Sequence, residues 1–169
     1  PLEILEAAYP VKFVRWELRE DSGGAGEFRG GLGAVYEIEL LEDNATVSLF
    51  GERGKFPPRG ISGGSAALKN KFTFQELDGY AELPLISKGV GVKLKYGQRV
   101  KLQTPGGGGY GSPFKRPLDM VLGDLEKGYI SHQTAENVYG LRIDRDGNVD
   151  RKETTKFRGE AEKTVNEKS

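Results

Sequence analysis

The stretches DSGGAGEFRGGLG (residues 21–33) and TPGGGGYGSP (residues 104–113) contain eleven of the 25 glycines in this chain. A glycine costs roughly 0.5–1 kcal/mol relative to alanine wherever its backbone freedom is not needed. Eleven such costs approach the whole stability of an ordinary domain, which is about 5–15 kcal/mol. Because aromatic, charged and proline residues interrupt both stretches, we interpret them as shaped loops whose backbone follows paths open only to glycine.

Alternating apolar residues around these loops indicate a mainly β (α+β) fold, an antiparallel sheet or sandwich-like domain with long glycine-rich loops and a small C-terminal helical segment. Residues 11–19 predict a strand with a one-residue bulge. Residues 34–50 predict a hairpin that turns at 42–44. Shorter strands are predicted at 71–76, 92–95 and 99–103, and residues 51–66, rich in glycine and proline, predict a long irregular segment.

The pattern becomes helical after Pro117. Apolar spacing predicts a helix that starts at residue 118 and stops before Gly128, and Ser131 is a favourable N-cap for a second helix over 132–138. Asp146 and Gly147 predict a tight turn. We therefore divide the chain into a glycine-loop-rich β domain (1–117), a short helical segment of the same domain (118–150) and a polar, flexible tail that is a frayed helix or disordered (151–169).

The overall composition excludes several classes of protein. The 25 basic and 25 acidic residues balance, so charge indicates neither a nucleic acid nor a membrane surface as a partner. With no cysteine and one histidine, the chain cannot form a disulfide or a zinc site of the usual Cys/His kind by itself, and we expect no metal bound by this chain alone. Lacking a long apolar run, the chain is expected to be soluble and cytoplasmic.

The two glycine loops each suggest a chemistry that has to be weighed against a structural role. Asp21-Ser22-Gly23-Gly24 is similar to the nucleophile region of trypsin-like proteases, but the only histidine available as a base is His132, in a predicted helix, so we favour a structural loop. The second loop lacks the Lys-Ser/Thr pair of a Walker motif and a surrounding βαβ unit. Two interpretations stay open for it: structural turning, or a backbone cradle for an anionic ligand formed by Thr104, Gly106, Gly107, Gly108 and Gly109.

Three side chains among these glycines are candidates for a functional role: Asp21, Arg29 and Tyr110. The separation of Asp21 and Arg29 allows an ion pair that closes the first loop. Arg29 has the alternative of binding an anion on a partner subunit. Arg53 and Arg59 flank a Pro-Pro pair and are further candidates for binding an anionic group.

In order along the chain, these motifs resemble the C-terminal region of the hydantoinase B/5-oxoprolinase family, which is related to the ATP-dependent acetone and acetophenone carboxylase subunits. The resemblance covers about residues 1–150. The matching motifs are PLEILE (1–6), ELR (17–19), DSGGAG (21–26), FRGGLG (28–33), PPRG (57–60), TPGGGGYG (104–111), Arg116, Val121, Asp124, Gly128 and Tyr139-Gly140.

The resemblance implies a role in a heteromeric complex. In this family a B-type subunit works with an A-type subunit that has an actin-like, ATP-binding fold, and some members use ATP to hydrolyse cyclic amides. We therefore expect ATP and Mg on the A-type partner, and a divalent metal in the remaining B-type segment. B-type subunits are several hundred residues long, so we expect this chain to be a split or processed C-terminal part that is inactive alone.

Three functions stay open at this point. The first is a component of an ATP-dependent cyclic amide hydrolase that shapes the active-site cavity and the subunit contacts, with Asp21, Arg29 and Tyr110 as candidate side chains. The second is a subunit of an ATP-dependent ketone carboxylase. The third is a non-catalytic assembly scaffold, which the lack of a complete set of catalytic side chains supports.

Overall fold

The computed structural model describes residues 1–76, 79–83, 85–144 and 146–166. The chain forms two compact units, each assembled from three separate stretches. Unit 1 comprises Pro1–Arg19, Gly33–Pro57 and Lys69–Pro105, and unit 2 comprises Glu20–Leu32, Pro58–Leu68 and Gly106–Ser169. This differs from the predicted β domain over 1–117, because three loops within that range belong to the same unit as the C-terminal helices.

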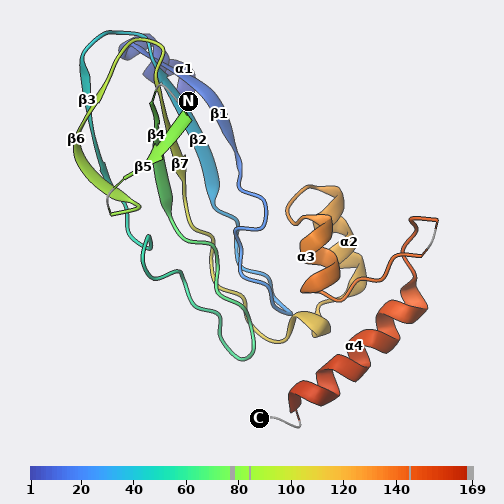
Figure 1. The fold of residues 1–169 in the computed structure, drawn as a ribbon. Coiled ribbons are helices and arrows are strands. Elements are labelled where there is room, and N and C mark those ends of the chain that lie inside the picture. Colours follow the sequence, from blue (N-terminus) through green and yellow to red (C-terminus); the bar gives the residue numbers. More distant parts are fainter. Residues whose placement is uncertain (77–78, 84, 145, 167–169) are drawn as a thin grey trace. The chain divides into compact units, whose positions relative to one another are not determined.

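Unit 1 contains the strands (Figure 1). An antiparallel sheet has the order β1 (Val11–Leu18), β2 (Ala34–Leu40), β7 (Arg99–Gln103), β4 (Lys71–Glu76) and β5 (Gly79–Glu82). A separate two-stranded ribbon pairs β3 (Ala45–Phe50) with β6 (Lys88–Leu94). A short helix, α1 (Leu2–Ala8), precedes β1.

The predicted strands are largely confirmed, whereas the predicted pairing between two of them is wrong. The register shifts between Phe13 and Arg15, which is the predicted bulge, and β4 and β7 have the predicted bounds. The hairpin over 34–50 is wrong, because β2 pairs with β1 and β7 whereas β3 pairs with β6. Alternation identifies a strand, but it carries no information about which other strand will accept its hydrogen bonds.

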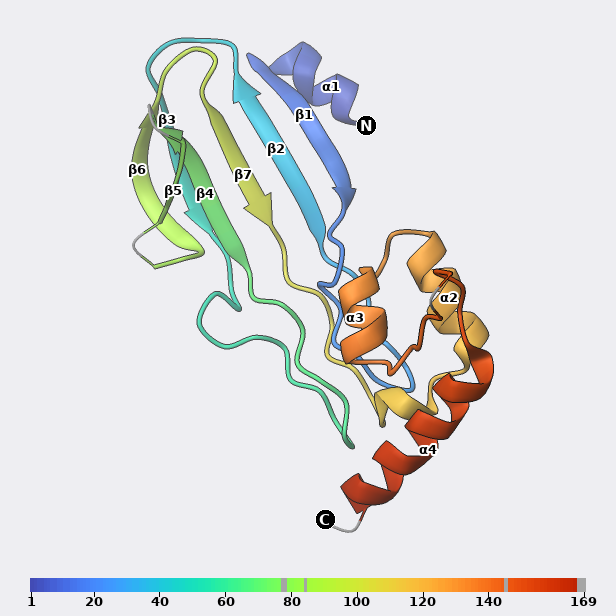
Figure 2. The same cartoon turned by 45° about the vertical axis from the view of Figure 1, so that its right-hand side comes forward.

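The core of unit 1 lies between the sheet and the ribbon. Leu40, Leu94 and Val100 are buried together, and the partly buried side chains packed on them come from both layers: Val11, Ala45, Val47, Leu49, Phe74, Val92 and Leu102. Figure 2 shows the ribbon curving over one side of the sheet. The mainly β, sandwich-like prediction is thereby confirmed.

Unit 2 holds the helical end. It contains a short 3₁₀ helix η1 (Pro113–Lys115), then α2 (Leu118–Glu126), α3 (His132–Asn137) and α4 (Arg151–Asn166). The Ser131 hydroxyl accepts a hydrogen bond from the Thr134 N–H at 3.1 Å, as predicted for an N-cap. Gly128 follows α2 with φ 65°, the conformation that favours glycine at a helix end.

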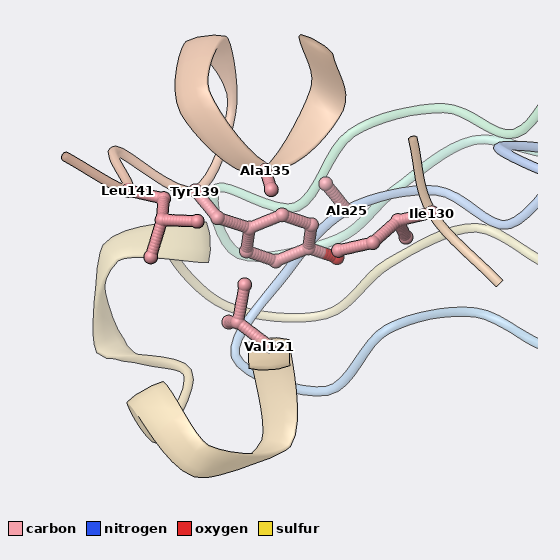
Figure 3. Close-up of a cluster of buried hydrophobic side chains, with 6 residues drawn as sticks. All are labelled: Ala25, Val121, Ile130, Ala135, Tyr139 and Leu141. Atoms are coloured by element: carbon pink, nitrogen blue, oxygen red, sulfur yellow. The ribbon is translucent and has the colours of Figure 1, made fainter. Parts of the chain in front are cut away.

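The core of unit 2 forms around one ring. The Tyr139 side chain is fully buried and lies between α2 and α3 (Figure 3). The other buried members of this cluster are Ala25, Val121, Ile130, Ala135 and Leu141. A loop of the first glycine stretch thus shares a hydrophobic core with residues more than ninety positions away, since Ala25 joins Val121.

Residues 151–169, predicted to be a frayed helix or disordered, form the helix α4 over the residues that the structure describes. Thr154 and Arg158 of this helix have buried side chains. The Thr154 hydroxyl accepts from the Arg142 N–H at 2.9 Å, and the Arg158 guanidinium donates to the Tyr139 carbonyl at 2.6 Å. Polar anchors of this kind leave no apolar periodicity, so the sequence pattern did not indicate a packed helix; residues 167–169 lie outside the described residues.

Candidate functional site: the glycine hub

Three loops of unit 2 form a single hydrogen-bonded assembly, which we call the glycine hub: residues 21–32, 58–68 and 106–112. The Gly24 N–H donates to Gly107 O at 2.8 Å, and the Gly107 N–H donates to Gly31 O at 2.9 Å. The second loop joins through Ser65, whose N–H donates to Ala25 O at 2.7 Å. These bonds connect backbone to backbone, so they specify the path of the chain with little help from side chains.

The loops approach one another more closely than any side chain would allow. A Cβ added at Gly30 would lie within 3 Å of the Gly107 carbonyl, and one at Gly109 within 3 Å of the Ala25 carbonyl. At such positions glycine is required by the space between backbones. This explains how a domain tolerates so many glycines, because the cost in chain entropy is offset by contacts that only glycine can make.

Two interpretations stay open from the sequence for the second glycine loop, structural turning or a cradle for an anionic ligand, and its hydrogen bonds bear on the choice. The N–H groups of Gly107, Gly109, Tyr110 and Gly111 donate to carbonyls of the hub, namely those of Gly31, Ser65, Phe28 and Ile61. An anion nest needs adjacent N–H groups that point at the ligand. Thr104 belongs to unit 1, where its hydroxyl accepts from the Ala34 N–H at 2.7 Å. Because the N–H groups of Gly107 and Gly109 are already bonded, the loop offers no two adjacent N–H groups within 106–109, which favours structural turning.

The outer side of the hub carries an apolar patch of three residues, Phe28, Ile61 and Tyr110. Tyr110 forms β-bridges with both Phe28 and Ile61, and the Phe28 and Tyr110 ring centroids are 6.2 Å apart. All three side chains are more than half exposed, at 62%, 65% and 52%. The backbone of the hub thus holds three large apolar side chains in water. One of them is Tyr110, which the sequence analysis named as a candidate for a functional role.

The predicted ion pair between Asp21 and Arg29 is wrong. The Asp21 carboxylate accepts from the Ser131 N–H at 2.9 Å and so holds the start of α3. Arg29 donates to Asp124, with Nε 3.0 Å from Oδ2 and Nη2 3.3 Å from Oδ1. Asp21 and Arg29 therefore do not contact each other. Each stabilises the hub by a bond to a residue at a helix about a hundred positions further along the chain.

Asp124 joins two arginines in a buried cluster. Arg116 Nη2 lies 2.8 Å from Asp124 Oδ2, and its Nη1 donates to the Glu27 carbonyl at 3.0 Å. Arg29 also donates to the Gly30 carbonyl at 2.7 Å. Both Arg116 and Asp124 are buried. Arg116 and Asp124 both stand in the sequence motifs, but the motifs did not indicate a role for either residue. No local pattern predicts that the side chains of Arg29 and Asp124 meet.

The remaining polar groups of unit 2 provide no complete catalytic set among the described residues. Ser22 is fully buried and therefore inaccessible as a nucleophile, and His132 is exposed at the start of α3. Burial raises the pKa of the Tyr139 phenol and lowers the pKa of the Arg158 guanidinium.

Within the ranges described, no three His, Cys, Asp or Glu side chains are grouped closely enough to hold a metal ion. No helix in these ranges is long and apolar enough to cross a bilayer.

Comparisons with known proteins agree with this fold. A sequence profile of the hydantoinase B/oxoprolinase family matches residues 1–113. The caprolactamase subunit beta of Pseudomonas jessenii is 40% identical over 88% of this chain and 26% of its own length. The crystal structure of the ATP-dependent caprolactamase from the same organism matches with a TM-score of 0.80 and 34% identity, over 94% of this chain and 28% of that chain.

A nucleotide-free acetone carboxylase structure also has this fold, with a TM-score of 0.75 and 22% identity over all of this chain and 27% of that chain. The present chain spans only 8% to 28% of the length of the curated relatives that it matches. The profile match covers most of the chain, including both glycine stretches. The chain therefore belongs to the hydantoinase B/oxoprolinase family.

Proposed function

We propose that this chain is part of the B-type subunit of an ATP-dependent enzyme that hydrolyses cyclic amides. Its likeness to the caprolactamase of Pseudomonas jessenii supports this, in both sequence and fold. Caprolactam is a cyclic amide, whose carbonyl is a poor electrophile and needs activation before water can attack. ATP and Mg belong to the A-type partner in this proposal, and any divalent metal belongs to the remaining B-type segment.

The contribution of this chain is to shape the cavity and to bind the neighbouring protein segments. The observation that carries this assignment is the patch of Phe28, Ile61 and Tyr110 on the glycine hub. Exposed apolar side chains grouped on a rigid surface mark interaction sites. Tyr110 contacts the remaining B-type segment in this proposal, while Asp21 and Arg29 act as positioning residues that hold the hub in shape.

The proposal is tested by reconstitution with the A-type subunit and the remaining B-type segment from the same source. Native mass spectrometry reports assembly, and ATP hydrolysis coupled to opening of a lactam or hydantoin reports activity. Tyr110→Ser should weaken assembly roughly tenfold, because it removes a large apolar contact. Tyr96→Ser, a matched change of an exposed tyrosine in unit 1, should leave assembly unchanged.

The same reconstitution separates the alternatives. ATP hydrolysis that requires a ketone and bicarbonate would assign the complex to the carboxylases. Full activity without this chain would leave only a scaffold role. A wild-type chain that finds no partner, or a Tyr110→Ser complex that forms as tightly as wild type, would contradict the assignment of the hub patch.

A further inference from the structure

Unit 1 contains a groove at the end of the β3–β6 ribbon, and none of its lining residues belongs to the hub. It has a volume of about 690 Å³, within the range of small-molecule sites, about 300–1,000 Å³. Its walls are residues 51–56, which leave β3, and residues 85–88, which lead into β6.

The backbone of both walls is strained. Arg53 has φ 66° and Ile86 has φ 62°, in the left-handed region that side chains rarely occupy. Positive φ is a genuine outlier for a β-branched residue such as Ile86. The Ser87 N–H donates to Leu85 O at 2.6 Å, so Ile86 is the centre of a three-residue γ-turn of the rare, strained kind. Strain of this type gathers at sites where a protein binds a ligand.

Hydrogen bonds hold the two strained residues in place. The Asn70 N–H donates to Arg53 O at 3.1 Å, and the Phe72 N–H donates to Ile86 O at 3.0 Å. The walls are also joined to each other, because the Ser87 hydroxyl donates to Gly51 O at 2.9 Å. The groove is therefore formed before any ligand arrives, which lowers the entropy cost of binding.

The charges along the groove favour an anion. Its lining contains three cations, Arg53, Lys55 and Lys88, and one acid, Glu52. Lys88 Nζ lies 2.7 Å from Glu52, and this hydrogen bond lowers the pKa of the Glu52 carboxyl, so the two charges neutralise each other. Arg53 and Lys55 have no carboxylate within ion-pair distance among the residues that the structure describes. Phe56 and Leu85 line the groove beside them and are 66% and 68% exposed.

We propose that this groove binds a small monocarboxylate with an apolar body. The guanidinium of Arg53 matches the two oxygens of a carboxylate, and the ammonium of Lys55 adds a second positive charge. The hydrocarbon part of the ligand covers Phe56 and Leu85 and so removes apolar surface from water. The proposal is independent of the proposed function, since it involves only residues of unit 1 and no partner subunit.

The experiment is a titration of the full chain, with isothermal calorimetry for affinity and amide chemical shifts for location. The probes are hexanoate, the uncharged isostere hexanamide and the cation hexylammonium. Hexanoate should bind at least tenfold more tightly than hexanamide, because a hydrogen bond to a charged group is stronger than one to a neutral group. Hexylammonium should not bind, and the shifts should centre on residues 51–56 and 85–88.

The key variant is Arg53→Asn, because asparagine tolerates the left-handed backbone that Arg53 adopts. It should reduce hexanoate affinity roughly tenfold and leave the weak binding of hexanamide unchanged. Arg151→Asn, the same change at an exposed arginine of unit 2, is the matched control and should bind hexanoate like wild type.

Several results would overturn the proposal. Equal affinity for hexanoate and hexanamide would show that charge is not recognised. Shifts confined to other residues would place the site elsewhere. Binding of acidic, apolar peptides with no binding of hexanoate would make the groove a protein interface. Because the comparison of probes uses the wild-type chain, it stands even if a variant fails to fold.

Discussion

The sheet of unit 1 and the glycine hub of unit 2 satisfy their backbone hydrogen bonds in different ways. In the sheet, regular ladders join strands and side chains alternate to either face, so many residue types fit each position. In the hub, irregular loops pack backbone against backbone, and positions such as Gly30 and Gly109 leave no space for a Cβ. The sheet therefore depends on pattern, whereas the hub depends on individual residues.

The comparison predicts that single changes in the hub and its charged cluster will cost more than changes of similar size at the surface or in unit 1. The largest effect is expected for Asp124→Ala. This change leaves Arg29 and Arg116 without the carboxylate that both contact. Breaking a buried ion pair costs about 3–5 kcal/mol, and we expect a loss near 4 kcal/mol in the free energy of unfolding. Urea denaturation followed by circular dichroism measures it.

The control for that change is Asp119→Ala on the same helix, where the carboxylate is 82% exposed and pairs with Arg151. An exposed ion pair contributes little to stability, so Asp119→Ala should lower the free energy of unfolding by less than about 1 kcal/mol. Equal losses for the two variants would mean that the buried cluster does not stabilise the hub.

Two neighbouring glycines give the next test. Gly30→Ala places a Cβ against the Gly107 carbonyl, whereas a Cβ at Gly31 meets nothing within 4 Å. Overpacking costs about 1–3 kcal/mol in the free energy of unfolding. Backbone atoms move aside less readily than side-chain atoms, so we expect a loss at the upper end, about 3 kcal/mol, for Gly30→Ala. Gly31→Ala should change stability by less than about 0.5 kcal/mol. If thermal unfolding separates the two by less than 1 kcal/mol, close backbone packing is not what requires glycine here.

A smaller effect is expected for Ser131→Ala, which removes the N-cap of α3. Loss of such a cap costs about 1 kcal/mol. The same thermal unfolding assay measures it, and Thr155→Ala, an exposed position inside α4, is the comparison. A loss above about 3 kcal/mol would show that Ser131 does more than cap a short helix.

The smallest effect belongs to unit 1 and depends on pH. Burial raises the pKa of Glu37, but hydrogen bonds from Tyr80 and Arg99 outweigh it, so the pKa is lowered overall. Burial and the bond to Glu37 raise the pKa of Tyr80 to about 12. Tyr80→Phe should cost only about 0.5 kcal/mol at neutral pH, because the phenol is partly exposed.

The sign of the pH dependence follows from these directions. A lowered carboxyl pKa stabilises the folded state above the ordinary value, and this stabilisation is lost as pH falls. The raised phenol pKa stabilises the folded state below about pH 10 and is lost toward pH 12. The difference between wild type and Tyr80→Phe should therefore shrink at both extremes. A difference that grows on acidification would contradict the assigned bond.

Local patterns predicted those parts of the fold that local geometry determines. The bulge in β1, the bounds of β7 and the N-cap at Ser131 each depend on residues within a few positions of one another. Predictions failed where distant residues decide the result. The hairpin over 34–50 required a choice of strand partners, and the Asp21–Arg29 pair ignored helices that lie far along the chain.

The site divides in the same way. The sequence showed that the glycine stretches are shaped loops, because so many glycines have a cost that only close packing or positive φ offsets. That Asp124 pairs with Arg29 across 95 positions was not visible, nor was the strained groove around Arg53 and Ile86.

By itself, the sequence determined the mainly β class, the positions of most strands and the family to which the chain belongs. Periodicity and motif order are properties of the chain alone. Only the tertiary structure decided which strands pair, which loops interlock in the hub and which charges meet. Those choices depend on contacts between residues distant in sequence, whose free energy exists only once the whole unit has packed.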